Sequence, residues 1–153
     1  MINHLNKKNK PQLVDISKKN ISLRIAKAES IIKFQPLIFK KIQKMKTKKG
    51  NIENIAILAG IMGAKETSKL IPLCHNIPIN YINIDISKLE VISSLKITSE
   101  VKTIEKTGVE MEALMAVTIT ALTIYDMCKS LSKQIKIKNI KLISKSGGKS
   151  DFN

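Results

Sequence analysis

Two kinds of apolar spacing divide the chain into predicted strands and helices. Apolar and polar residues alternate over 21–34, 79–87, 91–102 and 135–143, which predicts four strands. Apolar residues instead recur every three or four positions over 52–71 and 108–131, which predicts two long helices. A shorter helix is expected from Pro36 to about Lys46, because proline is favoured in the first helical turn. This order predicts an α+β sandwich, in which an antiparallel sheet carries helices on one face.

Composition places the chain among globular proteins. It has 153 residues, of which 43% are hydrophobic and 25% charged, so we expect one domain covering 1–153. No stretch approaches the roughly 20 uninterrupted apolar residues of a membrane span, and the polar N-terminus does not resemble a secretory signal. Cys74 and Cys128 are too few for a disulfide framework and lack zinc-ligand spacing. We therefore predict a cytoplasmic protein with no metal, no cofactor and no membrane partner.

The net charge of +15 raises the question of a nucleic-acid partner, because lysine and arginine neutralise phosphate backbones. Of the 27 basic residues, however, 26 are lysine, and the chain also holds 27 isoleucines and 11 asparagines. These are the residues of A/T-rich codons, and the few aromatic residues form no base-stacking cluster. A solvated lysine surface is therefore favoured over nucleic-acid binding. The only arginine, Arg24, stands out as a residue suited to bidentate contact with a carboxylate or phosphate.

Asp126 and Lys129 are the first candidate for chemistry. They lie three positions apart on one face of the last predicted helix, and the run 116–123 before them carries no charge. The ordinary explanation is a surface ion pair that contributes about 0–1 kcal/mol. The alternative is a functional pair, because charges on a largely buried helix tend to be paired or catalytic.

The other candidate functional residues also have ordinary structural explanations. His75 follows a helix and Pro72, and it could act as a general acid or base or could merely pack. Glu110 and Glu112 suit the first turn of a helix through its dipole. The segment 145–150 contains two glycines and two lysines but lacks P-loop spacing, so it is no P-loop, although it could close over an anion.

Six strings of residues together are more specific than any of these features. They are LVDIS (13–17), LAGI (58–61), LIPLCH (70–75), TGVEMEAL (107–114), ALTIYDMCK (121–129) and KSGGKS (145–150). In this order and spacing the chain closely resembles the MoaC family, the cyclic pyranopterin monophosphate synthases of molybdenum cofactor biosynthesis. The resemblance covers nearly the whole chain.

The resemblance implies a reaction and an assembly. The family converts 3′,8-cyclo-7,8-dihydroguanosine 5′-triphosphate, made by a radical SAM GTP cyclase, into a pyranopterin with a cyclic phosphate and releases pyrophosphate. This is phosphorus–oxygen lyase chemistry on a small GTP-derived molecule. The resemblance also implies a ferredoxin-like fold and a homohexamer, a trimer of dimers with its sites between subunits.

The resemblance further implies roles for individual residues. The catalytic set falls on Asp126, Lys129, His75 and Lys49, and the substrate-binding set on Leu73, Cys74, His75, Glu110, Met111, Glu112, Arg24 and Lys145. A carboxylate such as Glu112 suits the N–H donors of a guanine-like edge, and several cations suit a triphosphate. We expect Lys129 to keep Asp126 ionised, and neighbouring cations to favour a lowered lysine pKa.

Three positions depart from the family pattern. Asn51 stands where the family usually has aspartate, and Ile57 and Glu66 each replace an arginine. All three fall on or beside the first long helix, so they put its stability or its interface contacts in doubt more than the chemistry. They leave open a family member with eroded activity, alongside the enzyme and the nucleic-acid-binding alternatives.

Overall fold

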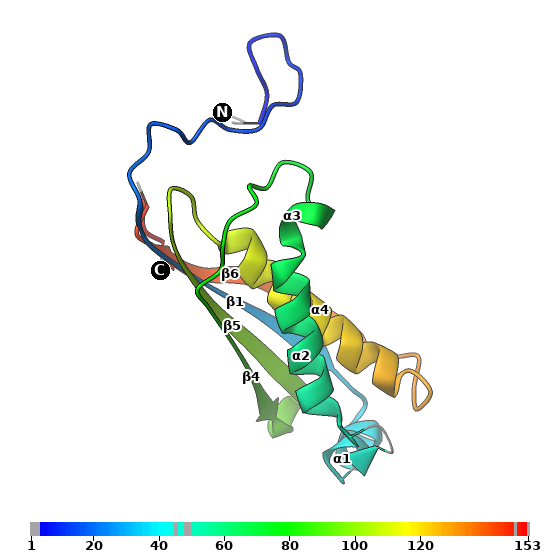
Figure 1. Ribbon diagram of the computed structural model, residues 1–153. Coiled ribbons are helices and arrows are strands. Elements are labelled where there is room, and N and C mark those ends of the chain that lie inside the picture. The colour runs from blue at the N-terminus through cyan, green and yellow to red at the C-terminus, as the bar shows by residue number, and fades with distance from the viewer. Residues whose placement is uncertain (1–3, 45, 48–49, 149, 153) are drawn as a thin grey trace.

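A four-stranded antiparallel sheet and two long helices form the body of the molecule (Figure 1). The computed structural model describes residues 4–44, 46–47, 50–148 and 150–152. The strands of the main sheet are β1 (Ser22–Lys33), β4 (Tyr81–Leu89), β5 (Ser94–Glu105) and β6 (Lys136–Ser146). The helices are α1 (Pro36–Lys44), α2 (Ile52–Lys65), α3 (Thr67–Leu70) and α4 (Glu110–Cys128). A two-stranded hairpin of β2 (Lys46–Thr47) and β3 (Gly50–Asn51) precedes α2.

The strand order is β4-β5-β1-β6, and every neighbouring pair is antiparallel. Helix α2 connects β1 to β4 with β5 between those two strands, and α4 connects β5 to β6 with β1 between them. Two split β-α-β units of this kind make the ferredoxin-like arrangement. The predicted α+β fold class is therefore confirmed. The order of the strands had not been predicted.

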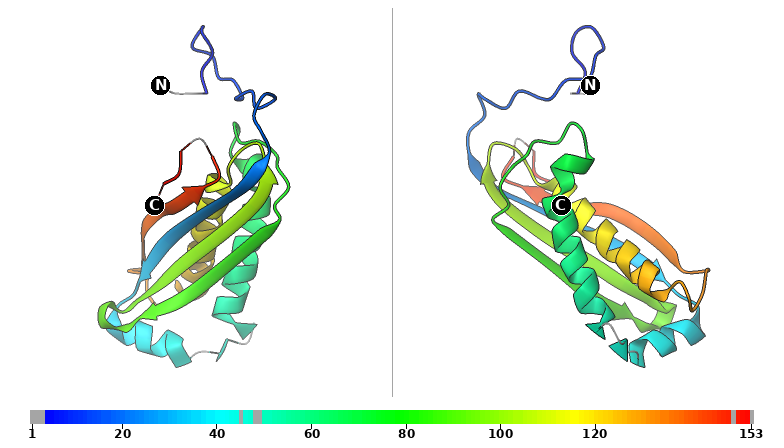
Figure 2. Two further views of the ribbon diagram at one scale, coloured as in Figure 1. Left: turned by 90° about the vertical axis from the view of Figure 1, so that its left-hand side faces the viewer. Right: turned by 45° about the vertical axis from the view of Figure 1, so that its right-hand side comes forward.

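Both long helices cover the same face of the sheet, and the other face is open (Figure 2). Alternate residues of β1 and β5, among them Ala28, Ile32, Ile97 and Val101, are fully buried beneath the helices. Burial of this apolar set supplies the main favourable contribution to folding.

Helices α2 and α4 approach each other closely because α2 carries glycine at the contact. A Cβ atom on Gly60 would overlap Thr120 Oγ1 and lie 2.8 Å from the carbonyl oxygen of Ala116. A Cβ on Gly63 would lie 2.6 Å from the Cγ1 atom of Ile119. Small residues at these positions therefore set the spacing of the helix pair.

The open face of the sheet is held by charge pairs that cross the strands. Glu29 on β1 binds Lys96 on β5 at 3.0 Å and Lys141 on β6 at 3.1 Å. Glu100 on β5 binds Lys27 on β1 and its own neighbour Lys102, each at 2.8 Å. Part of the lysine excess is therefore paired with carboxylates across the sheet.

The predicted element boundaries need small corrections. The strand expected from 91 begins at Ser94, because Glu90–Ile92 form a 3-10 turn that ends at Ser93 with φ of 50°. The last strand runs on to Ser146, past its expected end at 143, and the last helix ends at Cys128 instead of 131. The helix expected over 52–71 is divided into α2, which ends at Lys65, and the short α3. The hairpin β2–β3 was not predicted, because such short strands carry no measurable periodicity.

By length and composition alone one helix could cross a membrane, although carboxylates near both of its ends interrupt the apolar run. Within the described residues this is α4, with 19 residues and a mean hydropathy of 1.3. It packs against α2 and against β1, β5 and β6, so its apolar character is that of a core helix.

The three departures from the family pattern are accommodated in or next to α2. Asn51 caps the helix, because its side-chain oxygen accepts a hydrogen bond from the backbone N–H of Glu53 at 2.9 Å. Ile57 is partly buried against the core. Glu66 forms an ion pair with Lys69 at 2.7 Å. None of the three leaves a defect in this part of the chain.

Candidate active site

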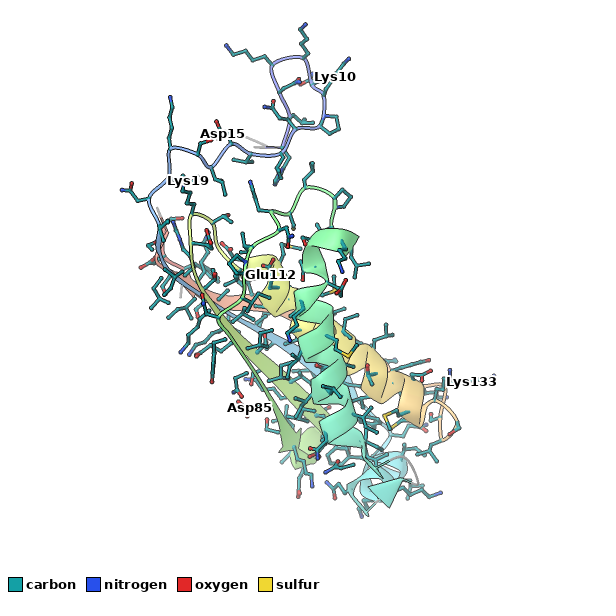
Figure 3. All side chains as sticks on the ribbon, viewed as in Figure 1. Lys10, Asp15, Lys19, Asp85, Glu112 and Lys133 are labelled. Atoms are coloured by element: carbon teal, nitrogen blue, oxygen red, sulfur yellow. The ribbon has the colours of Figure 1, made fainter. Side chains whose placement is uncertain are left out.

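Four segments that connect or extend the main elements meet at one end of the sheet (Figure 3). They are the N-terminal segment 13–20, the loop 71–80, the loop 106–109 and, from the C-terminal part, residues 147–148 and 150–152. Asp15, Lys19 and Glu112 lie at this end, and Lys133 lies at the opposite end of α4. The first turn of α4 projects into the same region, so carboxylates from a rigid helix face side chains from loops.

The first cavity at this end is rich in cations. It has a volume of about 840 Å³ and is lined by residues of the N-terminal segment, β1, the loop before α4 and the end of β6. Its basic side chains are Lys18, Lys19, Arg24, Lys106 and Lys145. Several cations around one cavity suit an anion with several phosphate groups.

A second cavity adjoins the first and contains most of the predicted binding residues. It has a volume of about 350 Å³, and its lining includes Leu73, Cys74, His75, Glu110, Met111 and Glu112. Lys19, Thr107, Gly108 and Glu110 line both cavities. The two cavities therefore form one cleft with a cationic end and an end that combines carboxylates with a histidine.

Glu112 is the most buried carboxylate of the cleft, with only 5% of the residue exposed. Burial raises the pKa of Glu112, and the negative charge of Glu110 raises it further. Burial also raises the pKa of the Cys74 thiol, with a smaller contribution from the charge of Glu112. This end of the cleft therefore holds groups that take or keep protons more readily than in water.

Arg24 and Lys145 both face the first cavity but already have contacts. Arg24 donates from Nε to the carbonyl oxygen of Glu105 at 3.2 Å and from Nη2 to that of Lys106 at 3.4 Å. Lys145 forms an ion pair with Glu110 at 3.3 Å. Arg24 thus fastens the loop before α4, and Lys145 joins the end of β6 to the first turn of α4.

Asp126 and Lys129 do not reach this cleft within one chain. Glu112 and Asp126 are fourteen positions apart on α4, which corresponds to about 21 Å along the helix axis. Lys129 Nζ donates to Asp126 Oδ1 at 2.6 Å, and the two side chains are 60% and 67% exposed. The structure therefore separates the predicted catalytic pair from His75 and the binding residues.

The expectation of a lowered lysine pKa is wrong for Lys129. The hydrogen bond to the Asp126 carboxylate, together with its charge, raises the pKa of Lys129. In this exposed pair the attraction of the partner carboxylate outweighs the opposing effect of burial on the lysine pKa. Lys49, the remaining predicted catalytic residue, lies outside the described residues, as does Lys149.

The cleft also contains residues that the sequence had not singled out. Lys106 donates from Nζ to the carbonyl oxygen of Ser17 at 2.9 Å, and Lys19 lines both cavities. Both lie beside strings that had been noted, LVDIS and TGVEMEAL, but a lysine in a lysine-rich chain gives no separate signal. In the described residues, no three or more His, Cys, Asp or Glu side chains are grouped so as to hold a metal ion.

Comparisons with known proteins agree on one family and one biosynthetic pathway. The MoaC family matches residues 13–148. A cyclic pyranopterin monophosphate synthase of Syntrophomonas wolfei is 50% identical over 147 residues, which are 96% of this chain and 94% of that protein. A protein of the same name from Helicobacter pylori is 48% identical over 154 residues, covering 100% of this chain and 98% of that protein. Molybdenum cofactor biosynthesis protein 1 of Drosophila melanogaster is 42% identical over 151 residues, but these form only 27% of that longer protein.

Proposed function

This chain belongs to the MoaC family, and we propose that it is a cyclic pyranopterin monophosphate synthase of molybdenum cofactor biosynthesis. It converts 3′,8-cyclo-7,8-dihydroguanosine 5′-triphosphate into cyclic pyranopterin monophosphate with release of pyrophosphate. The observation that carries the proposal is the shape and charge of the cleft, in which a cationic cavity adjoins a cavity with a buried carboxylate and a histidine. The substrate has the same division, with a triphosphate at one end and a purine-derived ring system at the other.

The triphosphate occupies the cationic cavity. Lys145 and Arg24 from the sheet bind phosphate oxygens there. Lys145 forms an ion pair with Glu110 in the structure, so phosphate binding replaces one anionic partner of Lys145 with another. Gly147 and Gly148 line the same cavity and leave room for the phosphate chain at the end of β6.

The ring system occupies the second cavity. Glu112 accepts hydrogen bonds from the N–H donors of the guanine-like edge, and Glu110 supports it from the same helical turn. Leu73, Cys74 and Met111 provide the less polar walls of this cavity. His75 lies in the same wall, where it exchanges protons with the rearranging ring.

Asp126 and Lys129 complete this cleft from a second copy of the chain. Two observations support a shared site: the roughly 21 Å along α4 between Glu112 and Asp126, and the exposure of the Asp126–Lys129 pair at the far end of that helix. Lys49 joins the catalytic set as the resemblance implies. A site of this kind exists only in an oligomer.

We further propose that the oligomer is a homohexamer built as a trimer of dimers. The outer faces of the two long helices support an assembly, because Leu58 and Met62 of α2 are each 60% exposed and Leu122 of α4 is 52% exposed. Large apolar side chains at successive turns of packed helices are typical of a surface that another subunit covers.

The cellular setting follows from the reaction. Residues 1–153 act as one catalytic domain in the cytoplasm, where a radical SAM GTP cyclase supplies the substrate. No nucleic acid is required, and the paired lysines of the open sheet face support that view.

The test is turnover of the purified chain. Incubation with the cyclised GTP intermediate is expected to yield the pterin product and one pyrophosphate per product. The matched control is GTP itself, which carries the same triphosphate but lacks the ring closure and is expected to give neither. Absence of pterin from a folded, oligomeric preparation would contradict the proposal and favour a member of the family with eroded activity.

A further inference from the structure

The LVDIS string (13–17) has no role in the reaction as described so far, although it lies beside the cleft. Val14 and Ile16 line the same cavity as His75. Two side chains from other parts of the chain hold this segment by its carbonyl groups. Lys106 Nζ donates to the carbonyl oxygen of Ser17 at 2.9 Å, and His75 Nε2 lies 2.8 Å from the carbonyl oxygen of Val14.

The second contact determines which ring nitrogen of His75 bears a hydrogen. A carbonyl oxygen carries no proton and can only accept, so the nitrogen 2.8 Å from it must be the donor. Nε2 therefore bears the hydrogen. A neutral imidazole carries one N–H, so Nδ1 is left with the lone pair.

The LVDIS segment is itself fixed at this place. The Asp15 carboxylate accepts hydrogen bonds from the backbone N–H of Ser17 at 2.8 Å and from the Ser17 hydroxyl. This turn presents the Ser17 carbonyl to Lys106, in the loop that leads into α4. The Val14 carbonyl thus lies against His75 in a turn that Asp15 closes internally and Lys106 attaches to the loop before α4.

We propose that the LVDIS segment is a positioning element of the active site, holding His75 as the Nε2–H tautomer so that Nδ1 is the atom that exchanges protons with the substrate. When His75 acts as a base, Nδ1 takes the substrate proton and the ring becomes an imidazolium. The bond from Nε2–H to Val14 is kept throughout, and the proton leaves again from Nδ1. A backbone carbonyl plays the orienting part that a carboxylate plays in hydrolase triads.

This inference rests on the proposed function for the role of His75, but its first test does not need turnover. The chain has two histidines, His4 and His75, so the spectrum of protein labelled with nitrogen-15 in histidine contains two imidazoles. The variant His4→Gln assigns them. At alkaline pH and without substrate, His75 is expected to show a protonated Nε2 and an unprotonated Nδ1. A protonated Nδ1, or the averaged signals of a ring that exchanges between tautomers, would overturn the proposal.

A second test releases the segment without touching His75. The double variant Asp15→Ala/Lys106→Met opens the turn and removes its contact with the loop before α4. The matched lysine control is Lys88→Met, on the exposed end of β4 that pairs with the start of β5, away from the cleft. The double variant is expected to move the His75 signals toward a tautomer mixture and to lower kcat about tenfold. The control is expected to retain the signals and kcat of the unaltered chain.

The two readouts separate positioning from phosphate binding. Because Lys106 is one of the cations of the first cavity, its loss is also expected to raise KM, but a change in KM does not alter the His75 signals measured without substrate. Identical His75 signals in the double variant and in the Lys88→Met control would overturn the positioning role. If the His75 signals behave as expected but the unaltered chain makes no pterin, the proposed function fails and the tautomer assignment stands.

Discussion

Lys129 and Asp126 form an ion pair of 2.6 Å across one turn of α4, at the end of the helix opposite the cleft. Because both side chains are exposed, replacing either by alanine is expected to cost at most about 1 kcal/mol of folding free energy. Because the two residues are proposed to act as one catalytic unit, each replacement is expected to lower turnover by a factor on the order of 10² or more.

Pterin formation and thermal unfolding of Asp126→Ala, Lys129→Ala and the double variant check this prediction. The double variant is expected to lose far less than the product of the two single losses, as residues that act as a unit do. Near-normal turnover together with a collapsed melting temperature would show that the pair is structural.

A site shared between subunits predicts complementation between inactive variants. Glu112→Gln removes the carboxylate that one subunit contributes to the site, and Asp126→Ala removes the carboxylate that its partner contributes. Each variant alone is therefore expected to have little activity. After the two are unfolded together and reassembled at equal amounts, random pairing in an isologous dimer leaves about one quarter of the sites intact. Mixing two preparations of the same variant is the control. A mixture no more active than its components would exclude the shared site.

Replacing Glu112 is expected to raise the stability of the fold and to lower the activity. Its pKa is raised in the folded protein, so the folded state holds the proton more tightly than the unfolded state does. Stability associated with this group is therefore present at low pH and is lost as the pH rises above its ordinary value of 4.5. At neutral pH, Glu112→Gln is expected to stabilise the protein by about 1 kcal/mol, or roughly 2–4 °C in melting temperature, while activity falls.

The neighbouring carboxylate provides the control for this comparison. Glu110→Gln loses the ion pair with Lys145 and is expected to leave stability unchanged or reduce it by no more than about 1 kcal/mol. Melting curves across the acid-to-neutral range distinguish the two variants. A lower melting temperature for Glu112→Gln at neutral pH would show that its charge is stabilised in the fold.

The open face of the sheet is expected to contribute to acid sensitivity. Hydrogen bonds from Lys96 and, less strongly, from Lys141 lower the pKa of Glu29. This group therefore stabilises the fold above its ordinary pKa of 4.5, and that stabilisation is lost as the pH falls through the lowered value. Glu29→Gln is expected to cost about 1 kcal/mol at neutral pH and nothing in strong acid. Urea unfolding at both conditions measures this, with the exposed Glu90→Gln as control. An equal loss at both pH values would contradict the assignment.

The close contact of α2 with α4 predicts an asymmetry between two glycines. Gly60→Ala is expected to destabilise the fold by about 2 kcal/mol, because its Cβ meets the backbone carbonyl of Ala116 as well as side chains. A Cβ on Gly63 meets Ile119 instead of a backbone carbonyl: rotation can move the Cγ1 atom, and the Cβ atom at 2.9 Å requires a small shift of the helix, so the loss is expected to be smaller. Chemical unfolding of both variants measures the difference. Equal losses would show that both contacts relax alike.

The sequence by itself determined the long elements and the residues assigned to function. Period-two alternation in β1 and three- to four-residue spacing in α4 reflect which side chains face the core, so both elements were predictable within a few residues. The strings that contain His75 and Glu112 were also recognisable, because the match of consecutive residues to a family pattern does not depend on three-dimensional contacts.

Only the tertiary structure decided which of these residues meet. Residues 13–17, His75, Lys106 and Glu112 come together because the strand order β4-β5-β1-β6 brings four connecting segments to one end of the sheet. The same straight helix that carries Glu112 into the cleft carries Asp126 about 21 Å away from it. Spacing along a helix shows that two residues share a face. Pairing between strands far apart in the chain decides which end of the molecule each residue reaches, and no local pattern encodes that pairing.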